Sequence, residues 1–68
     1  MKVYVEEIED LSTHGVTNYS LVRGMEFYDA EVRASGIEIL NRDGTEIDND
    51  ELYNELENAV VKEVYRNV

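Results

Sequence analysis

The sequence predicts an α+β domain: an antiparallel β-sheet of about four strands with one C-terminal α-helix packed on one face. Three observations predict it. Several short stretches within the first 47 residues place apolar residues at alternate positions, which is the period of half-buried strands. Turn-forming residues interrupt this alternation at short intervals. The apolar period then changes to that of a helix and keeps it almost to the end of the chain.

The expected strands are separated by turn signals, and one of them is interrupted by a change of phase. In the first strand, Val3 and Val5 share one phase and Ile8 takes the other, which indicates a bulge near Glu6-Glu7. Gly24 breaks or bends the next apolar stretch. Residues 41–44 form a further turn signal. The strands are expected at residues 2–9, 17–23, 26–34, 37–41 and, as a short segment, 45–47.

The third of these strands has the clearest alternation. Tyr28, Ala30 and Val32 would face the core, while charged residues occupy the positions between them. After Ser35-Gly36 the apolar phase is reversed, as a tight hairpin or a glycine bulge would cause. This strand is therefore expected to have a charged outer face.

The C-terminal helix is expected over residues 48–66. Its apolar stripe follows the spacing i, i+4, i+7, i+8 and i+12, at Leu52, Leu56, Ala59, Val60 and Val64. Its start has three signals. Asp48 would be the N-cap, Glu51 its capping-box partner, and Ile47 and Leu52 the two residues of a hydrophobic staple.

Length and composition limit the class of protein. The 68 residues are expected to form one domain, residues 1–68, with a small core. The absence of cysteine excludes disulfides and Cys-based zinc sites and favours a reducing cytoplasm. Because no long apolar stretch occurs, neither a signal peptide nor a membrane span is expected. The prediction is a cytoplasmic protein, in the host cell if the chain is viral.

The net charge of −10 is the most unusual property of the chain. A small domain needs a net charge of only about 2 to 8 for solubility. Seven acids lie in residues 1–34 and nine in residues 35–68, so the 16 acids do not form a tail. The excess negative charge is distributed over a folded surface and requires another explanation.

The acidic stretch EIDNDELYNELE, residues 46–57, does not fit a calcium loop. If Gly44 took the glycine position of an EF-hand, Ile39 would be the first ligand, and it has no side-chain oxygen. If Glu51 took the last ligand position, the glycine position would fall on Thr45. Weak attraction of a divalent cation is left open, but no metal site and no cofactor is predicted.

Part of the acidity has a local role. Asp48, Asp50 and Glu51 lie where the helix dipole favours negative charge by about 0.3 to 1 kcal/mol each.

Carboxylates on alternate strand residues would be about 6.6 Å apart, a separation similar to that of charges along a nucleic-acid backbone. We therefore expect a surface for a basic partner, and its candidate residues are Glu6, Glu7, Glu9, Asp10, Glu46, Asp48, Asp50, Glu51, Glu55 and Glu57.

In size, absence of cysteine and dispersed carboxylates, the chain resembles the small acidic DNA-mimic inhibitors that phages make. The resemblance has no sequence motif, so no residue is transferred by alignment. It implies a non-enzymatic DNA mimic that occupies the nucleic-acid-binding surface of a basic host protein and inhibits it. A nucleoid-associated protein of the HU type is an example of such a target. The resemblance also implies action as a homodimer.

Other functions are weighed against this one. Five tyrosines are many for a small domain, so the alternative is a structural or protein-interaction module with a tyrosine-rich surface, which could form a homodimer. An enzyme is not expected: His14, the only histidine, lies in a predicted surface turn, and Ser12, near it in the sequence, lacks the nucleophile-elbow context of a catalytic triad. Direct nucleic-acid binding is disfavoured because the four arginines are scattered and phosphates would be repelled.

Overall fold

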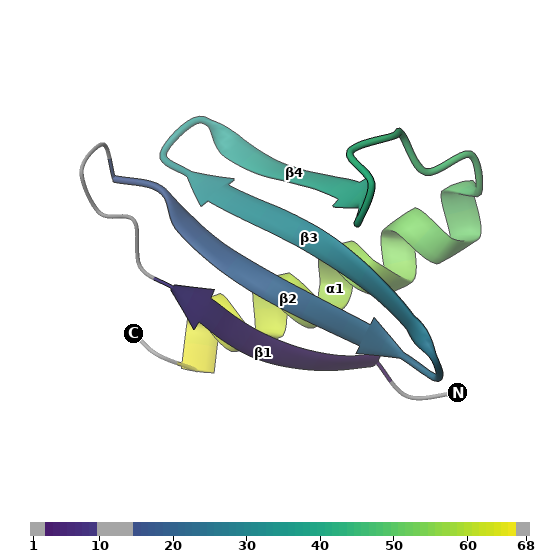
Figure 1. Ribbon diagram of the computed structural model, residues 1–68. Coiled ribbons are helices and arrows are strands. Elements are labelled where there is room, and N and C mark those ends of the chain that lie inside the picture. Colours follow the sequence, from purple (N-terminus) through teal and green to yellow (C-terminus); the bar gives the residue numbers. More distant parts are fainter. Residues whose placement is uncertain (1–2, 10–14, 67–68) are drawn as a thin grey trace.

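One antiparallel sheet and one helix make up the structure, a computed structural model that describes residues 3–9 and 15–66, with the backbone alone for residues 7–9 (Figure 1). The predicted fold class is confirmed. The elements are β1 (Val3–Glu9), β2 (Thr17–Arg23), β3 (Glu26–Arg33), β4 (Gly36–Asn41) and α1 (Asp50–Arg66). The expected start of the first strand at residue 2 and the loop with Ser12 and His14 lie outside the described residues.

The strands follow one another across the sheet in the order β1-β2-β3-β4, and every neighbouring pair is antiparallel. Two-residue turns join β2 to β3 and β3 to β4, after the closing pairs Arg23↔Glu26 and Arg33↔Gly36. The break expected at Gly24 is the first of these turns. Gly24 has a φ of 63°, which a residue with a Cβ rarely adopts. The phase reversal after residue 34 is the second, a tight hairpin.

The segment at 45–47 differs from its prediction. It forms a single bridge, Leu40↔Glu46, and not a strand. A turn accounts for the difference: the Asn41 amide donates to the Thr45 carbonyl at 2.9 Å, so the chain has just reversed when it reaches Glu46. In β1 the register shifts between Glu7 and Glu9, which places the irregularity one residue after the predicted bulge.

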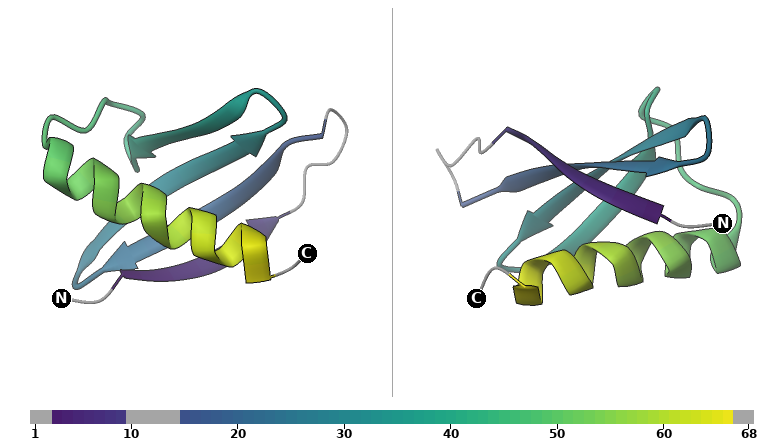
Figure 2. Two further views of the ribbon diagram at one scale, coloured as in Figure 1. Left: turned by 180° about the vertical axis from the view of Figure 1, so that it is seen from behind. Right: turned by 90° about the horizontal axis from the view of Figure 1, so that it is seen from below.

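The core lies between one face of the sheet and α1. Three of its side chains, Leu21, Leu56 and Val60, are fully buried. Other buried residues come from β2, β3 and β4: Tyr19, Tyr28, Ala30 and Ile39. Figure 2 shows α1 running across this face and, among the described residues, no element on the opposite face. The opposite face is called the open face below.

The helix begins at Asp50, two residues later than predicted. Asn49 is the N-cap, because its Oδ1 accepts from the Leu52 amide at 3.1 Å and its carbonyl accepts from the Tyr53 amide at 2.9 Å. The predictions of Asp48 as N-cap and Glu51 as its capping-box partner are therefore wrong. Ile47 lies one residue too early for the predicted staple, although it still packs against the core.

Candidate functional site

The open face carries a row of carboxylates. Cross-strand partners lie side by side on the same face of a sheet, and the pairs Glu6↔Ser20, Ser20↔Asp29, Asp29↔Leu40 and Leu40↔Glu46 place five residues in one line. Neighbouring strands are about 4.8 Å apart, so Glu6, Asp29 and Glu46 follow at intervals of about 10 Å. All three are exposed. We call Glu6, Asp29 and Glu46 the acidic row.

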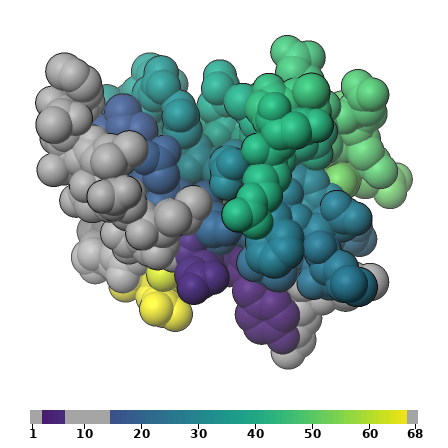
Figure 3. Space-filling model, viewed as in Figure 1, coloured from purple at the N-terminus to yellow at the C-terminus, as the bar shows by residue number. Residues whose placement is uncertain are grey.

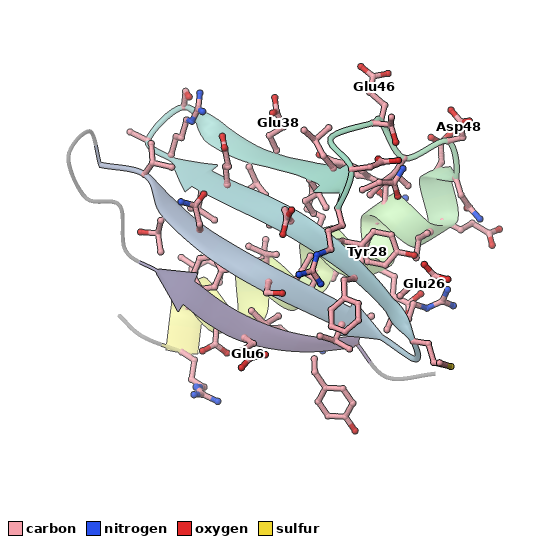
Figure 4. The ribbon with its side chains drawn as sticks, in the orientation of Figure 1. Glu6, Glu26, Tyr28, Glu38, Glu46 and Asp48 are labelled. Carbon is pink, nitrogen blue, oxygen red and sulfur yellow. The ribbon has the colours of Figure 1, made fainter. Side chains whose placement is uncertain are left out.

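A second pair of acids lies next to this row. Glu31 and Glu38 are direct cross-strand partners, and like charges in this position destabilise a sheet. Arg33 relieves part of the repulsion through an ion pair with Glu31. Figure 4 shows Glu38 and Glu46 projecting at the β4 edge of the sheet. The negative surface thus continues from the acidic row to this edge.

Hydrogen bonds in the turn after β4 hold Glu46 in place. The Nδ2 of Asn41 donates to the Glu46 carbonyl and to Thr45 Oγ1, both at 3.1 Å. Asp43 Oδ1 accepts from Thr45 Oγ1 at 2.6 Å and from the Thr45 amide at 3.0 Å. These two bonds, the side-chain bond first, lower the pKa of the Asp43 carboxyl. The last member of the acidic row is therefore attached to an ordered turn.

Three further predicted residues surround the start of α1. Asp48 belongs to the segment that joins the turn to the helix, and Asp50 and Glu51 begin the helix itself. Their side chains are exposed (Figure 4 labels Asp48). These three acids follow Glu46 in the sequence, but they lie beyond the sheet and outside the acidic row. Of the predicted acids at residues 46–51, the structure therefore aligns Glu46 with Glu6.

Glu55 has a different environment from the one predicted. Its Oε2 lies 3.3 Å from Nε of Arg23, without hydrogen-bond geometry, and both side chains are about one third exposed. Arg23 shares its sheet face with Val3, which packs against the core, so this ion pair joins the helix to the sheet. Glu55 is therefore an internal contact rather than part of the open face. Glu57 is half-buried on α1.

Three predicted acids of the first strand and its loop cannot be placed as side chains. Glu7 and Glu9 belong to β1, where they pair with Tyr19 and Asn18 through the backbone, and their side chains lie outside the described residues. Asp10 also lies outside them. Of the four acids predicted for the site in residues 6–10, Glu6 is the one whose side chain the structure describes.

Sequence reasoning missed three acids of the open face as site residues: Asp29, Glu31 and Glu38. A signal was present for two of them. A two-residue turn at Ala34-Ser35 necessarily pairs residue 31 with residue 38, because each pair in an antiparallel hairpin has the same sum of residue numbers. The link from Asp29 to Glu6 needs the strand order, which the local pattern does not contain.

The four arginines of the chain have partners outside the acidic row. Each has an acidic or aromatic partner within the chain: Arg23 with Glu55, Arg33 with Glu31, Arg66 with Glu63, and Arg42 over the ring of Phe27. Among the described side chains, no Lys or Arg forms an ion pair with the acidic row. Within the described part of the chain, these three carboxylates are thus exposed and have no cation paired with them.

Within residues 3–9 and 15–66, no three His, Cys, Asp or Glu side chains come together as a metal site would require. In the same part of the chain, no helix combines the length and the apolar composition needed to cross a membrane.

Comparisons with protein family models, with curated proteins and with solved structures found no match to this chain. The fold is that of a small α+β domain in which none of the described elements covers the second face of the sheet.

Proposed function

We propose that this chain is a non-enzymatic acidic binding protein that acts as a DNA mimic. It occupies the nucleic-acid-binding surface of a basic host protein and inhibits it by excluding the nucleic acid. A nucleoid-associated protein of the HU type, encountered in the cytoplasm, is the proposed kind of target. The observation that carries the proposal is the acidic row, Glu6, Asp29 and Glu46, which lies on the open sheet face and forms no ion pair with a Lys or Arg among the described side chains.

The spacing of the row supports the proposal. Its intervals of about 10 Å fall between the widths of the two grooves of B-DNA, about 6 and 12 Å, which separate the phosphates of opposite strands. Because a sheet fixes the separations, the carboxylates need little reorganisation on binding. A basic surface that is shaped for phosphates would meet negative charge at similar distances, and the net charge of −10 would accelerate the encounter.

Repulsion between carboxylates within the chain also supports the proposal. Glu31 opposes Glu38 across a strand pair, and the ion pair of Arg33 with Glu31 leaves Glu38 without a cation among the ion pairs of the described residues. Like charges in direct cross-strand positions are destabilising relative to neutral residues. Acids that oppose folding are better explained by binding than by stability.

The test is displacement of labelled duplex DNA from a purified HU-type protein, measured by fluorescence anisotropy over a range of salt concentrations. The wild-type chain should displace the DNA, and its affinity should fall steeply as salt rises. The triple variant Glu6→Gln, Asp29→Asn, Glu46→Gln should lose at least tenfold in affinity and show a smaller salt dependence. Failure of the wild-type chain to displace DNA at low salt would refute the proposal.

A matched control separates the acidic row from net charge. The triple variant Asp50→Asn, Glu51→Gln, Glu57→Gln removes the same number of charges from the helix. It should lose clearly less affinity than the first triple variant. Equal losses would show that binding follows total charge and that the acidic row has no special part.

The alternative function, a protein-interaction module with a tyrosine-rich surface, has one observation in its favour. Tyr4 is 63% exposed and Tyr65 75% exposed, whereas Tyr19 and Tyr28 are buried in the core. A module of this kind would bind a partner, or a second copy of itself, with little salt dependence. Light scattering at several protein concentrations distinguishes a homodimer from a monomer.

A further inference from the structure

A second row of side chains on the open face is apolar. The pairs Tyr4↔Val22 and Val22↔Phe27 place these three residues side by side on β1, β2 and β3. Tyr4 is 63% exposed and Phe27 43% exposed, although both are large and apolar. We call Tyr4, Val22 and Phe27 the aromatic row. Figure 3 shows the face on which it lies, with the β1 and β2–β3 segments forming its lower part.

The aromatic row and the acidic row are neighbours along the strands. Glu6 follows Tyr4 by two residues on β1, and Asp29 follows Phe27 by two residues on β3. Two residues of a strand span about 6.6 Å. Each exposed ring therefore has a carboxylate beside it on the same face, an arrangement that suits a side chain with both a flat surface and a positive charge.

The chain itself places an arginine on one of these rings. The guanidinium carbon of Arg42 lies 5.0 Å from the centroid of the Phe27 ring. This is within the distance of a cation–π contact, which is worth about 0.5 to 1 kcal/mol at an exposed site. Arg42 covers Phe27 from within the molecule. Tyr4, at the other end of the aromatic row, has the larger exposed ring.

We propose that the two rows together bind arginine side chains of the basic partner, so that the protein prefers arginine-rich to lysine-rich surfaces. This inference rests on the proposed function and names the chemistry of its partner. A guanidinium stacks on the Tyr4 ring and pairs with the Glu6 carboxylate. A lysine ammonium is compact and strongly hydrated, so it gains from the carboxylate but little from the ring. Charge complementarity brings the partner to the face, and the rings select arginine.

The experiment compares a nine-residue oligo-arginine peptide with a nine-residue oligo-lysine peptide. Their affinities for the full chain are measured by fluorescence anisotropy at two salt concentrations. The wild-type chain should bind oligo-arginine about two- to fivefold more tightly for each ring engaged. Tyr4→Leu should reduce this ratio and leave the affinity for oligo-lysine unchanged. Tyr4→Phe should keep the ratio, because the ring remains.

Tyr65→Leu is the control, because Tyr65 is an even more exposed tyrosine on α1, which covers the other face of the sheet. It should keep the wild-type ratio. Equal binding of the two peptides by the wild-type chain, or an unchanged ratio in Tyr4→Leu, would overturn the inference while the proposed function stands. If neither peptide binds and DNA is not displaced from the HU-type protein, the proposed function and this inference both fail.

Discussion

Replacement of Asn49 by alanine tests where the helix begins. The change removes the Oδ1 acceptor of the Leu52 amide, a bond of 3.1 Å, and removes no packing because Asn49 is exposed. Loss of such a cap costs about 1 kcal/mol. At about 0.05 to 0.15 kcal/mol per residue, the whole chain has an unfolding free energy of about 3 to 10 kcal/mol. Asn49→Ala should therefore lower the melting temperature by about 4 to 8 °C.

The assay is thermal and urea unfolding followed by circular dichroism. Asp48→Ala is the control, because the sequence alone favours Asp48 as the cap and the structure does not. Its effect should stay within about 0.5 kcal/mol. Asn49→Asp should keep the cap and add a favourable charge at the helix start. A large loss in Asp48→Ala together with no loss in Asn49→Ala would show that the helix begins earlier and that the cap assignment is wrong.

Three further predictions follow from the packing and the charges. Leu56→Ala, at a fully buried position, should cost about 2 to 5 kcal/mol and leave much of the chain unfolded at 37 °C, as monitored by circular dichroism. A double-mutant cycle on Arg23 and Glu55 should give a coupling below about 1 kcal/mol that shrinks with salt, because the pair is partly exposed. Thr45→Val should raise the pKa of the Asp43 carboxyl in a titration followed by NMR, since it removes the main hydrogen bond that lowers this pKa.

The sign of the Asp43 effect follows from linkage. In the folded chain the pKa of this carboxyl lies below its usual value of 3.8. The stability that it contributes is therefore fully present above 3.8 and is lost as the pH falls through the folded-state pKa. Thr45→Val should reduce this part of the acid dependence, and an unchanged NMR titration of Asp43 would contradict the assigned hydrogen bonds.

The strands could be predicted because each of them buries only one face. Alternation of Tyr28 and Ala30 with charged residues follows directly from that burial. The helix start could not be predicted to the residue. Asp48 and Asn49 are both good N-cap residues. Which of them becomes the N-cap depends on the path of the backbone between the preceding turn and the helix.

The candidate site was less accessible to sequence reasoning than the fold. Membership of Glu6 and Asp29 in one row depends on the order of the strands, since two strand spacings separate them. The engagement of Glu55 by Arg23 depends on the direction in which the helix crosses the sheet. Both are tertiary facts. The number of acids and the alternation that exposes them can be read from the sequence. Which acids lie together on the folded sheet cannot.

The simple order of the strands also bears on how quickly the protein becomes functional. Each strand pairs with the one made just before it, so the sheet assembles without closing long loops, and topologies of this kind fold rapidly. The chain contains no proline, which removes the slow cis–trans isomerisation that delays many proteins. A newly synthesised molecule can thus present its four-stranded surface as a single unit, without a slow maturation step.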